Sequence, residues 1–136
     1  MTRIVITSVA LRIFGDDLIP EEITHALGAE PTRWAKRGEA EVSSPRKRLA
    51  KTGFWQLSMP DRQPGDLDAQ INGLFTALTD DLSIWASLTE RHGADLFCGL
   101  FMNETNEGVV LERETLQAIA SRGLALNLDI YGPSVD

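Results

Sequence analysis

The stretch Pro20–Thr32, with the sequence PEEITHALGAEPT, combines a helix start, a short helix and a helix stop. Proline at the first helical position loses no internal hydrogen bond, and Glu21 and Glu22 place negative charge where the helix dipole favours it. Gly28 can adopt the left-handed conformation that ends many helices, and Pro31 cannot prolong one. The stretch therefore predicts a short helix that the chain leaves in a defined direction.

Several segments have the residue patterns of β-strands. Ile4–Phe14 alternates β-branched and apolar residues on one face, and Phe54–Met59 alternates in the same way after a glycine. Leu96–Met102 is apolar on both faces, so we expect a central strand that is covered on both sides. Leu124–Tyr131 alternates leucine and isoleucine with a distinct polar face, and Val109–Leu111 is a candidate short edge strand. The chain is thus predicted to contain a sheet.

Two further segments repeat apolar residues at helical spacing. The first runs from Leu67 to Leu82, with Asp66 as its N-cap, and Asp80 and Asp81 interrupt it before a further turn or two. The second is Arg113–Arg122, closed by a glycine. Its inward residues are predicted to be Leu116, Ile119 and Ala120.

The order of these elements is strand, helix, strand, long helix, strand, helix, strand. It contains two βαβ-like units joined by a helix, which favours helices packed on one side of a sheet. We therefore predict an α+β fold: a two-layer sandwich of ferredoxin-like character, whose mixed or antiparallel sheet has helices mainly on one face. A length of 136 residues is that of one ordinary domain, so residues 1–136 are predicted to form a single α+β domain.

The composition is that of a folded, non-membrane protein, with 43% hydrophobic and 24% charged residues and no apolar run long enough to cross a bilayer. Arg12 interrupts the N-terminal apolar run, and no small-residue cleavage site follows, so a first strand is favoured over a secretory signal. Cys98 is the only cysteine and lies in an apolar run, as a buried small hydrophobe would. These features predict a cytoplasmic location without membrane association.

The net charge of −7 conceals a strong asymmetry. The segment Arg33–Lys51 holds seven basic and two acidic residues, a balance of +5, which leaves −12 for the rest of the chain. Such an acidic remainder argues against nucleic acid as a partner. The simplest interpretation of the segment is a solvated, mobile loop that lies against its own acidic domain.

The chain resembles a bacterial single-domain family that is catalogued as domain of unknown function 4279. The resemblance rests on the Pro20–Thr32 helix with its glycine and Pro-Thr ending, on Gly38, on the strand containing Trp55, on the leucine-rich helix, and on the closing Asp129-Ile130-Tyr131. It spans nearly the whole chain. One departure is Ile19, where that family more often has a polar residue able to cap the helix. The resemblance implies a single cytoplasmic domain and supplies no reaction or ligand.

The sequence contains no recognisable catalytic or metal-binding motif. His25 and His92 are the only histidines, and neither has a partner at metal-ligand spacing. No nucleophile elbow, P-loop or dinucleotide fingerprint is present. The acidic pairs Asp16-Asp17 and Asp80-Asp81 fit solubility and capping better than cation binding. We therefore predict no catalytic residue, no metal site and no cofactor, and do not expect an enzyme.

Two groups of residues remain as candidate binding sites. In the first, Asp129 and Tyr131, with Asn127, share an open sheet surface with Arg12, Gln56 and Ser58. An Arg12–Asp129 ion pair explains these residues structurally and is favoured over a ligand site. The second group is the basic segment, where tryptophans near both ends accompany the cations and could help to hold a phosphate, a carboxylate or an acidic surface. Its candidate residues are Arg33, Trp34, Lys36, Arg37, Arg46, Lys47 and Arg48.

Two classes of function follow. The favoured one is a noncatalytic protein-interaction or regulatory module, including the small acidic kind that neutralises a partner, as immunity proteins do. The alternative is a domain that binds a small anionic ligand or a nucleotide with the 33–51 segment. A homodimer is a further expectation if an apolar patch on the outer sheet face is exposed. The residues of that predicted patch are Ile4, Ile6, Phe14 and Phe54.

Overall fold

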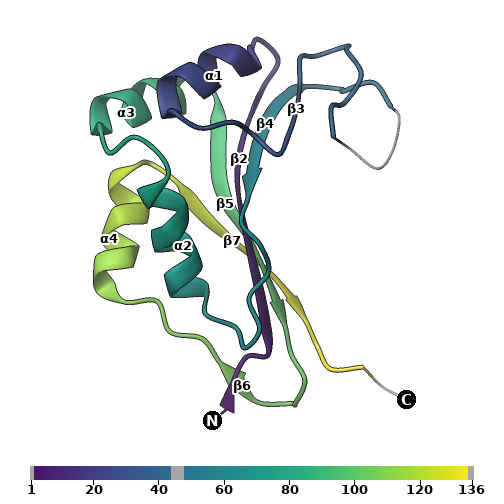
Figure 1. Ribbon diagram of the computed structural model, residues 1–136, viewed down its shortest axis with the longest axis vertical. Helices are drawn as coiled ribbons and strands as arrows, with labels where there is room; N and C mark the ends of the chain where they lie inside the picture. The colour runs from purple at the N-terminus through teal and green to yellow at the C-terminus, as the bar shows by residue number, and fades with distance from the viewer. Residues whose placement is uncertain (1, 44–47, 135–136) are drawn as a thin grey trace.

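The structure, a computed structural model, describes residues 2–43 and 48–134. The helices among these residues all lie on the same side of the main sheet (Figure 1), and none is long and apolar enough to cross a membrane. The elements, in chain order, are β1 (Thr2–Arg3), β2 (Ile6–Gly15), α1 (Pro20–Leu27), β3 (Arg33–Ala35), β4 (Gly53–Ser58), α2 (Leu67–Thr76), α3 (Leu82–Arg91), β5 (Gly93–Phe101), β6 (Glu107–Gly108), α4 (Arg113–Ser121) and β7 (Ala125–Tyr131).

Five strands of the described chain form the main sheet, in the order β3-β4-β2-β5-β7, while β1 and β6 form a separate parallel pair. Neighbouring strands of the main sheet are antiparallel except for β5 and β7. The predicted two-layer α+β sandwich, with a mixed sheet and helices on one face, is confirmed. Of the two βαβ-like units, β5–α4–β7 has parallel strands, whereas β2 and β4, which flank α1, run antiparallel.

Helix α1 begins and ends where the sequence predicts. Gly28 adopts the left-handed conformation, with φ of 82°, and its N–H donates to the Thr24 carbonyl. Ile19 occupies the N-cap position and provides no side-chain hydrogen bond, as expected of an isoleucine. The helix is attached to the sheet through Thr24, whose Oγ1 accepts a 3.0 Å hydrogen bond from Nε1 of Trp55 in β4.

A buried polar contact fixes the start of α2 on β2. The Thr7 hydroxyl donates to Oε1 of Gln70 at 2.6 Å, and Nε2 of Gln70 donates to the Thr7 carbonyl at 3.0 Å. The Thr7 hydroxyl also accepts from the backbone N–H of Asp66, the N-cap residue of α2. Because these buried groups satisfy one another, the register of α2 along β2 is defined by hydrogen bonds as well as by packing.

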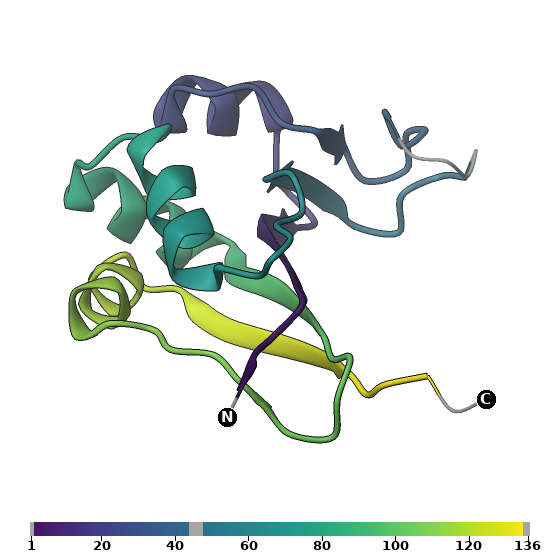
Figure 2. The ribbon, with the colours of Figure 1, turned by 60° about the horizontal axis from the view of Figure 1, so that its bottom comes forward.

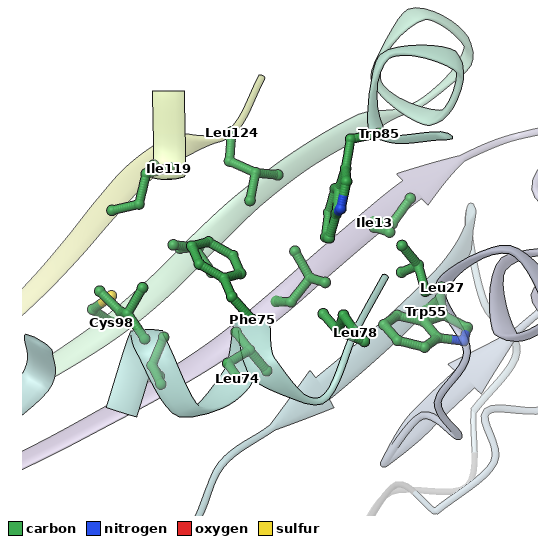
Figure 3. Close-up of a cluster of buried hydrophobic side chains, with 14 of the residues drawn as sticks. Ile13, Leu27, Trp55, Leu74, Phe75, Leu78, Trp85, Cys98, Ile119 and Leu124 are labelled. Atoms are coloured by element: carbon green, nitrogen blue, oxygen red, sulfur yellow. The ribbon is translucent and has the colours of Figure 1, made fainter. Parts of the chain in front are cut away.

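The hydrophobic core lies between the helices and the sheet (Figure 3). Leu11 and Ile13 of β2, the central strand, are fully buried there. Trp85 of α3 is also fully buried, packs edge-on against Phe75 of α2 and donates its Nε1 hydrogen to the Thr79 carbonyl. Both indoles of the core are thus hydrogen-bonded, as buried tryptophans usually are.

Several details differ from the prediction. Strand β5 is covered on both faces, as predicted, but the described helices all lie on one side of the sheet (Figure 1), and Asp95 and Gly99 on the other face are buried by side chains of the sheet itself. Ile4 precedes β2 and is buried, not part of an outer face. The short pairing strand is β6, at Glu107–Gly108, and not Val109–Leu111. Leu116 is exposed because α4 faces the core with Thr115, which accepts a hydrogen bond from Asn72 of α2, and with Ile119.

Truncation of Leu11 tests the position of the core. We expect Leu11→Ala to lower the free energy of unfolding by about 2–5 kcal/mol, because it leaves a cavity at the centre of the sheet. The matched control is Leu116→Ala, which removes the same atoms from an exposed leucine and is expected to change stability by about 0.5 kcal/mol or less. Urea denaturation of both variants provides the measurement, and equal losses would contradict this description of the core.

Cys98 provides an independent probe of the same core. Its thiol is fully buried, and burial, with a smaller contribution from the charge of Asp95, raises its pKa to about 12. Almost no thiolate exists at neutral pH, so a thiol reagent should label the protein only as fast as the core opens. We expect faster labelling in Leu11→Ala than in the wild type. Labelling of the native protein as fast as of the denatured chain would contradict the burial of Cys98.

Candidate functional site

The side of the main sheet opposite the helices, here called the open face, carries the candidate residues. Strand register places Asn127, Asp129 and Tyr131 on this face with Arg12, Gln56 and Ser58, as the sequence predicts. The same register places five aromatic side chains there. Tyr131 was predicted to share this surface with Arg12, and Phe14 and Phe54 were predicted on the outer sheet face, whereas Phe97 and Phe101 were not predicted there. The aromatic residues of the open face are Phe14, Phe54, Phe97, Phe101 and Tyr131.

Arg12 is held by Asp95, its direct neighbour on β5. Nε and Nη2 of Arg12 donate to the two carboxylate oxygens of Asp95 at 2.8 and 2.6 Å, and the guanidinium lies 4.3 Å from the centre of the Phe97 ring. The hydrogen bond to Asp95 raises the pKa of Arg12. A two-pronged pair that also stacks on an aromatic ring has little rotational freedom. Arg12 is therefore a fixed cation.

The predicted Arg12–Asp129 ion pair is wrong. Asp129 lies opposite Gly99, four residues along β5 from Asp95, so it is about 13 Å from Arg12 along the strand direction and also two strands away. The Asp129 carboxylate instead accepts a 2.6 Å hydrogen bond from the Tyr131 hydroxyl, which raises the pKa of Tyr131. Asp129 and Tyr131 therefore form a separate pair near the end of the sheet.

The described parts of the basic segment fold back over the β3 edge of the sheet, and most of their residues are exposed. Isolated bridges join Trp34 to Val42 and Ala40 to Leu49. Arg33 and Arg48 both donate to Glu41, at 3.0 and 2.7 Å, and the Glu41 side chain is only 6% exposed. Two cations are thus gathered around one buried carboxylate.

The other predicted residues of the segment are dispersed. Trp34 lies opposite Trp55 and so belongs to the helix side of the sheet. Arg37 pairs at 3.3 Å with Asp16 on the surface, and Lys36 is exposed without an ion pair to any described residue. Arg46 and Lys47 lie outside the described residues. Among the described residues of the segment, Arg33 and Arg48 therefore remain as site residues. Arg12 of β2 is the third arginine of the site.

These three arginines line one pocket, here called the basic pocket, with a volume of about 490 Å³. It lies over β2 and β4, beneath the folded-back segment. Nε of Arg33 is buried in its wall and has no hydrogen-bond partner among the described residues, and the Arg33 guanidinium lies 5.3 Å from the centre of the Phe54 ring. The other lining residues that bear on binding are Phe14, Glu41, Lys51 and Gln56.

The roles of Asp95, Glu41 and Lys51 escaped the sequence prediction. A single signal in the sequence pointed to Glu41, namely an acidic residue within a run of basic ones. The partner of Arg12 left no local signal, because the two residues are 83 positions apart. Sheet register alone brings them together.

The pocket is equipped to hold an anion. Three arginines and one lysine line it, and none of its described lining residues is a histidine or a cysteine. Among the described residues, no three histidine, cysteine, aspartate or glutamate side chains converge as metal ligands would. The arrangement therefore suits electrostatic recognition of carboxylate or phosphate oxygens with hydrogen bonds from Gln56.

A comparison with protein families places most of the chain in one family. The family model described as Domain of unknown function (DUF4279) matches residues 5–133, and the chain belongs to this family. No curated protein and no solved structure matches the chain significantly. The basic pocket must therefore be interpreted from its own chemistry.

Removal of Asp95 tests whether Arg12 is a fixed cation. We expect Asp95→Ala to lower the free energy of unfolding by about 1–3 kcal/mol, because Arg12 keeps its position over Phe97 but loses both carboxylate acceptors. The control is Asp16→Ala, which breaks an exposed pair with Arg37 and should cost about 0–1 kcal/mol. Thermal and urea denaturation of the two variants give the comparison, and a smaller loss for Asp95→Ala would refute the assignment.

Proposed function

We propose that the protein is a noncatalytic binding module whose basic pocket receives an anionic group of a small ligand. One observation carries this proposal: cations from separate parts of the chain converge on a single aromatic-walled pocket in a protein of net charge −7. An ordinary surface distribution of charge would not concentrate them there. This favours the alternative predicted from the sequence over the general interaction module.

The charge balance of the pocket supports an anion. Arg12, Arg33, Arg48 and Lys51 contribute +4 and Glu41 contributes −1, which leaves +3. Counting Asp95, which neutralises Arg12, the balance is still +2. A cleft of one sign on a molecule of the opposite net sign concentrates its counter-ion locally.

The pocket size and walls indicate the kind of ligand. A volume of about 490 Å³ lies within the range of roughly 300–1,000 Å³ that is usual for small-molecule sites. Phe14 is 40% exposed, and its ring and that of Phe54 provide apolar walls beside the arginines. A ligand with an anionic group and an apolar or ring-shaped body would use both features.

A thermal-shift screen with inorganic phosphate, nucleoside mono- and diphosphates and aromatic carboxylates tests the proposal. A ligand at a hundred times its Kd stabilises the folded state by about 2.7 kcal/mol, which is readily detected. We expect Arg48→Ala and Lys51→Ala each to reduce the shift. Lys36→Ala is the matched control, since it removes a cation from the same segment but outside the pocket. A wild-type protein that no anion stabilises would refute the proposal.

A variant that makes the basic pocket more positive gives a sharper test of anion binding. Glu41→Gln removes the carboxylate of the pocket wall, and the amide oxygen can accept from only one of the two arginines that Glu41 holds. The other guanidinium becomes available to the ligand, so we expect tighter anion binding at low salt, opposite in direction to Arg48→Ala. Calorimetric titration of the best ligand from the screen measures both changes. Circular dichroism of each variant verifies that the fold is intact, and weaker binding by a folded Glu41→Gln variant would contradict an electrostatic site.

Recognition of an acidic protein partner, including neutralisation of that partner, is a second candidate function. It is favoured by the exposed aromatic surface that continues from the pocket along the open face to the stacked rings of Phe101 and Tyr131, which are 4.7 Å apart. A partner could place an acidic side chain in the pocket while covering these rings. Competition between phosphate and short acidic peptides distinguishes the two functions, because only the second predicts that peptides bind.

A further inference from the structure

The two edge strands of the main sheet differ in length and in whether another segment of the described chain pairs with them. The β3 edge is three residues long, carries Arg33 and is continued by the bridge from Trp34 to Val42. The β7 edge is seven residues long, and no described residue pairs with its outer side. It contains no proline, lysine or arginine, which are the usual means of preventing an edge from pairing. Figure 2 shows β7, in yellow, along the margin of the sheet.

Strand β7 is also apolar where it is exposed. Leu128 and Ile130 are on the helix side of the sheet, yet they are 44% and 58% exposed because α4 does not cover them. On the open face Tyr131 is half exposed and stacks on Phe101. An exposed strand with these properties is a typical site for pairing with another strand.

The backbone direction defines which groups are available at this edge. The Tyr131 carbonyl accepts a hydrogen bond from Met102, so it points toward β5. Because the direction alternates along a strand, the N–H and C=O groups of Leu126, Leu128 and Ile130 point to the open edge. These three residues would make the hydrogen bonds to an added strand.

The sequence of β7 is complementary to itself in antiparallel pairing. Full overlap of Ala125–Tyr131 with its copy centres the pairing on Leu128, which places Asn127 opposite Asp129 and Leu126 opposite Ile130. In this register no backbone hydrogen bonds join Asn127 to Asp129, and in antiparallel pairs of this kind the side chains lie closest. The side-chain amide of Asn127 can then donate to the Asp129 carboxylate. A pairing centred on Asp129 would instead oppose two carboxylates.

We propose that β7 pairs antiparallel with β7 of a second copy of this chain, which joins two main sheets into one continuous sheet with all helices on one side. The twofold axis passes through Leu128, so that each Asn127–Asp129 contact occurs twice. We propose this surface in place of the homodimer patch predicted from the sequence. In the structure Ile4 of that patch is buried, and Phe14 and Phe54 are walls of the basic pocket. The basic pocket lies toward the other edge, so the dimer leaves it open and does not depend on its function.

Native mass measured by sedimentation equilibrium from micromolar to millimolar concentration tests the pairing. We expect a two-chain mass for the wild type. Asn127→Asp opposes carboxylates in both contacts and should raise the dimer dissociation constant about tenfold. Addition of Asp129→Asn to that variant restores a carboxylate–amide pair and should restore the dimer. A wild type of one-chain mass throughout overturns the proposal.

A second pair of variants provides a control for surface hydrophobicity. Leu128→Lys opposes two lysines at the axis and should abolish the dimer, whereas Leu116→Lys changes an equally exposed leucine on α4 and should leave it intact. A dimer that survives both Asn127→Asp and Leu128→Lys, or one that Leu116→Lys disrupts equally, overturns the assignment to β7. Because none of these variants changes a buried side chain, circular dichroism should show an unchanged fold.

Discussion

The hydrogen bonding of β2 to β4 on one side and to β5 on the other is the constraint on which the rest of the structure depends. Alternate residues of this central strand point to opposite faces. Leu11 and Ile13 therefore enter the core, while Arg12 and Phe14 lie on the open face. A shift of one residue would exchange the two sets, so the packing of the helices and the composition of the basic pocket are fixed by the same register.

A sheet with helices on one side must cover its second side with its own side chains. Here Phe14 lies over Gly93 of the neighbouring strand, and Phe101 lies over Gly99 of its own strand, so aromatic rings fill the space above both glycines. Arg12 covers Phe97 and is neutralised by Asp95. The folded-back basic segment covers one corner of the face and brings further cations there. The open face is thus partly self-covered, and the basic pocket is the space left beneath that segment.

Features encoded by neighbouring residues were predicted well. The limits of α1 follow from Pro20 and Gly28, and the Asp66 cap marks the start of α2. The start of α3 likewise follows the predicted interruption at Asp80 and Asp81, since the Asp81 side chain caps α3, although α2 ends earlier than predicted, at Thr76. Each of these signals acts within one helical turn, so it does not depend on the rest of the fold.

Features that depend on contacts between distant residues were not predicted well from the sequence. The face of α4 was misjudged at Leu116, since a hydrogen bond between Thr115 and Asn72 of another helix orients it. The contacts that hold the basic segment were not predicted either, since Glu41 pairs with Arg33 and Arg48 at the sheet edge. In both cases a contact between separate parts of the chain outweighs the local pattern.

The amino-acid sequence alone determined the α+β class, the limits of most helices and strands, and the alternation that separates a core face from a polar one. Those properties arise from interactions over a few residues, and any chain with this pattern would share them. The choice of Asp95 over Asp129 as the partner of Arg12, the gathering of cations around the basic pocket and the exposure of β7 arose only when the strands took their order. Strand order and register come from pairing across many residues, and no single segment of the sequence carries that information.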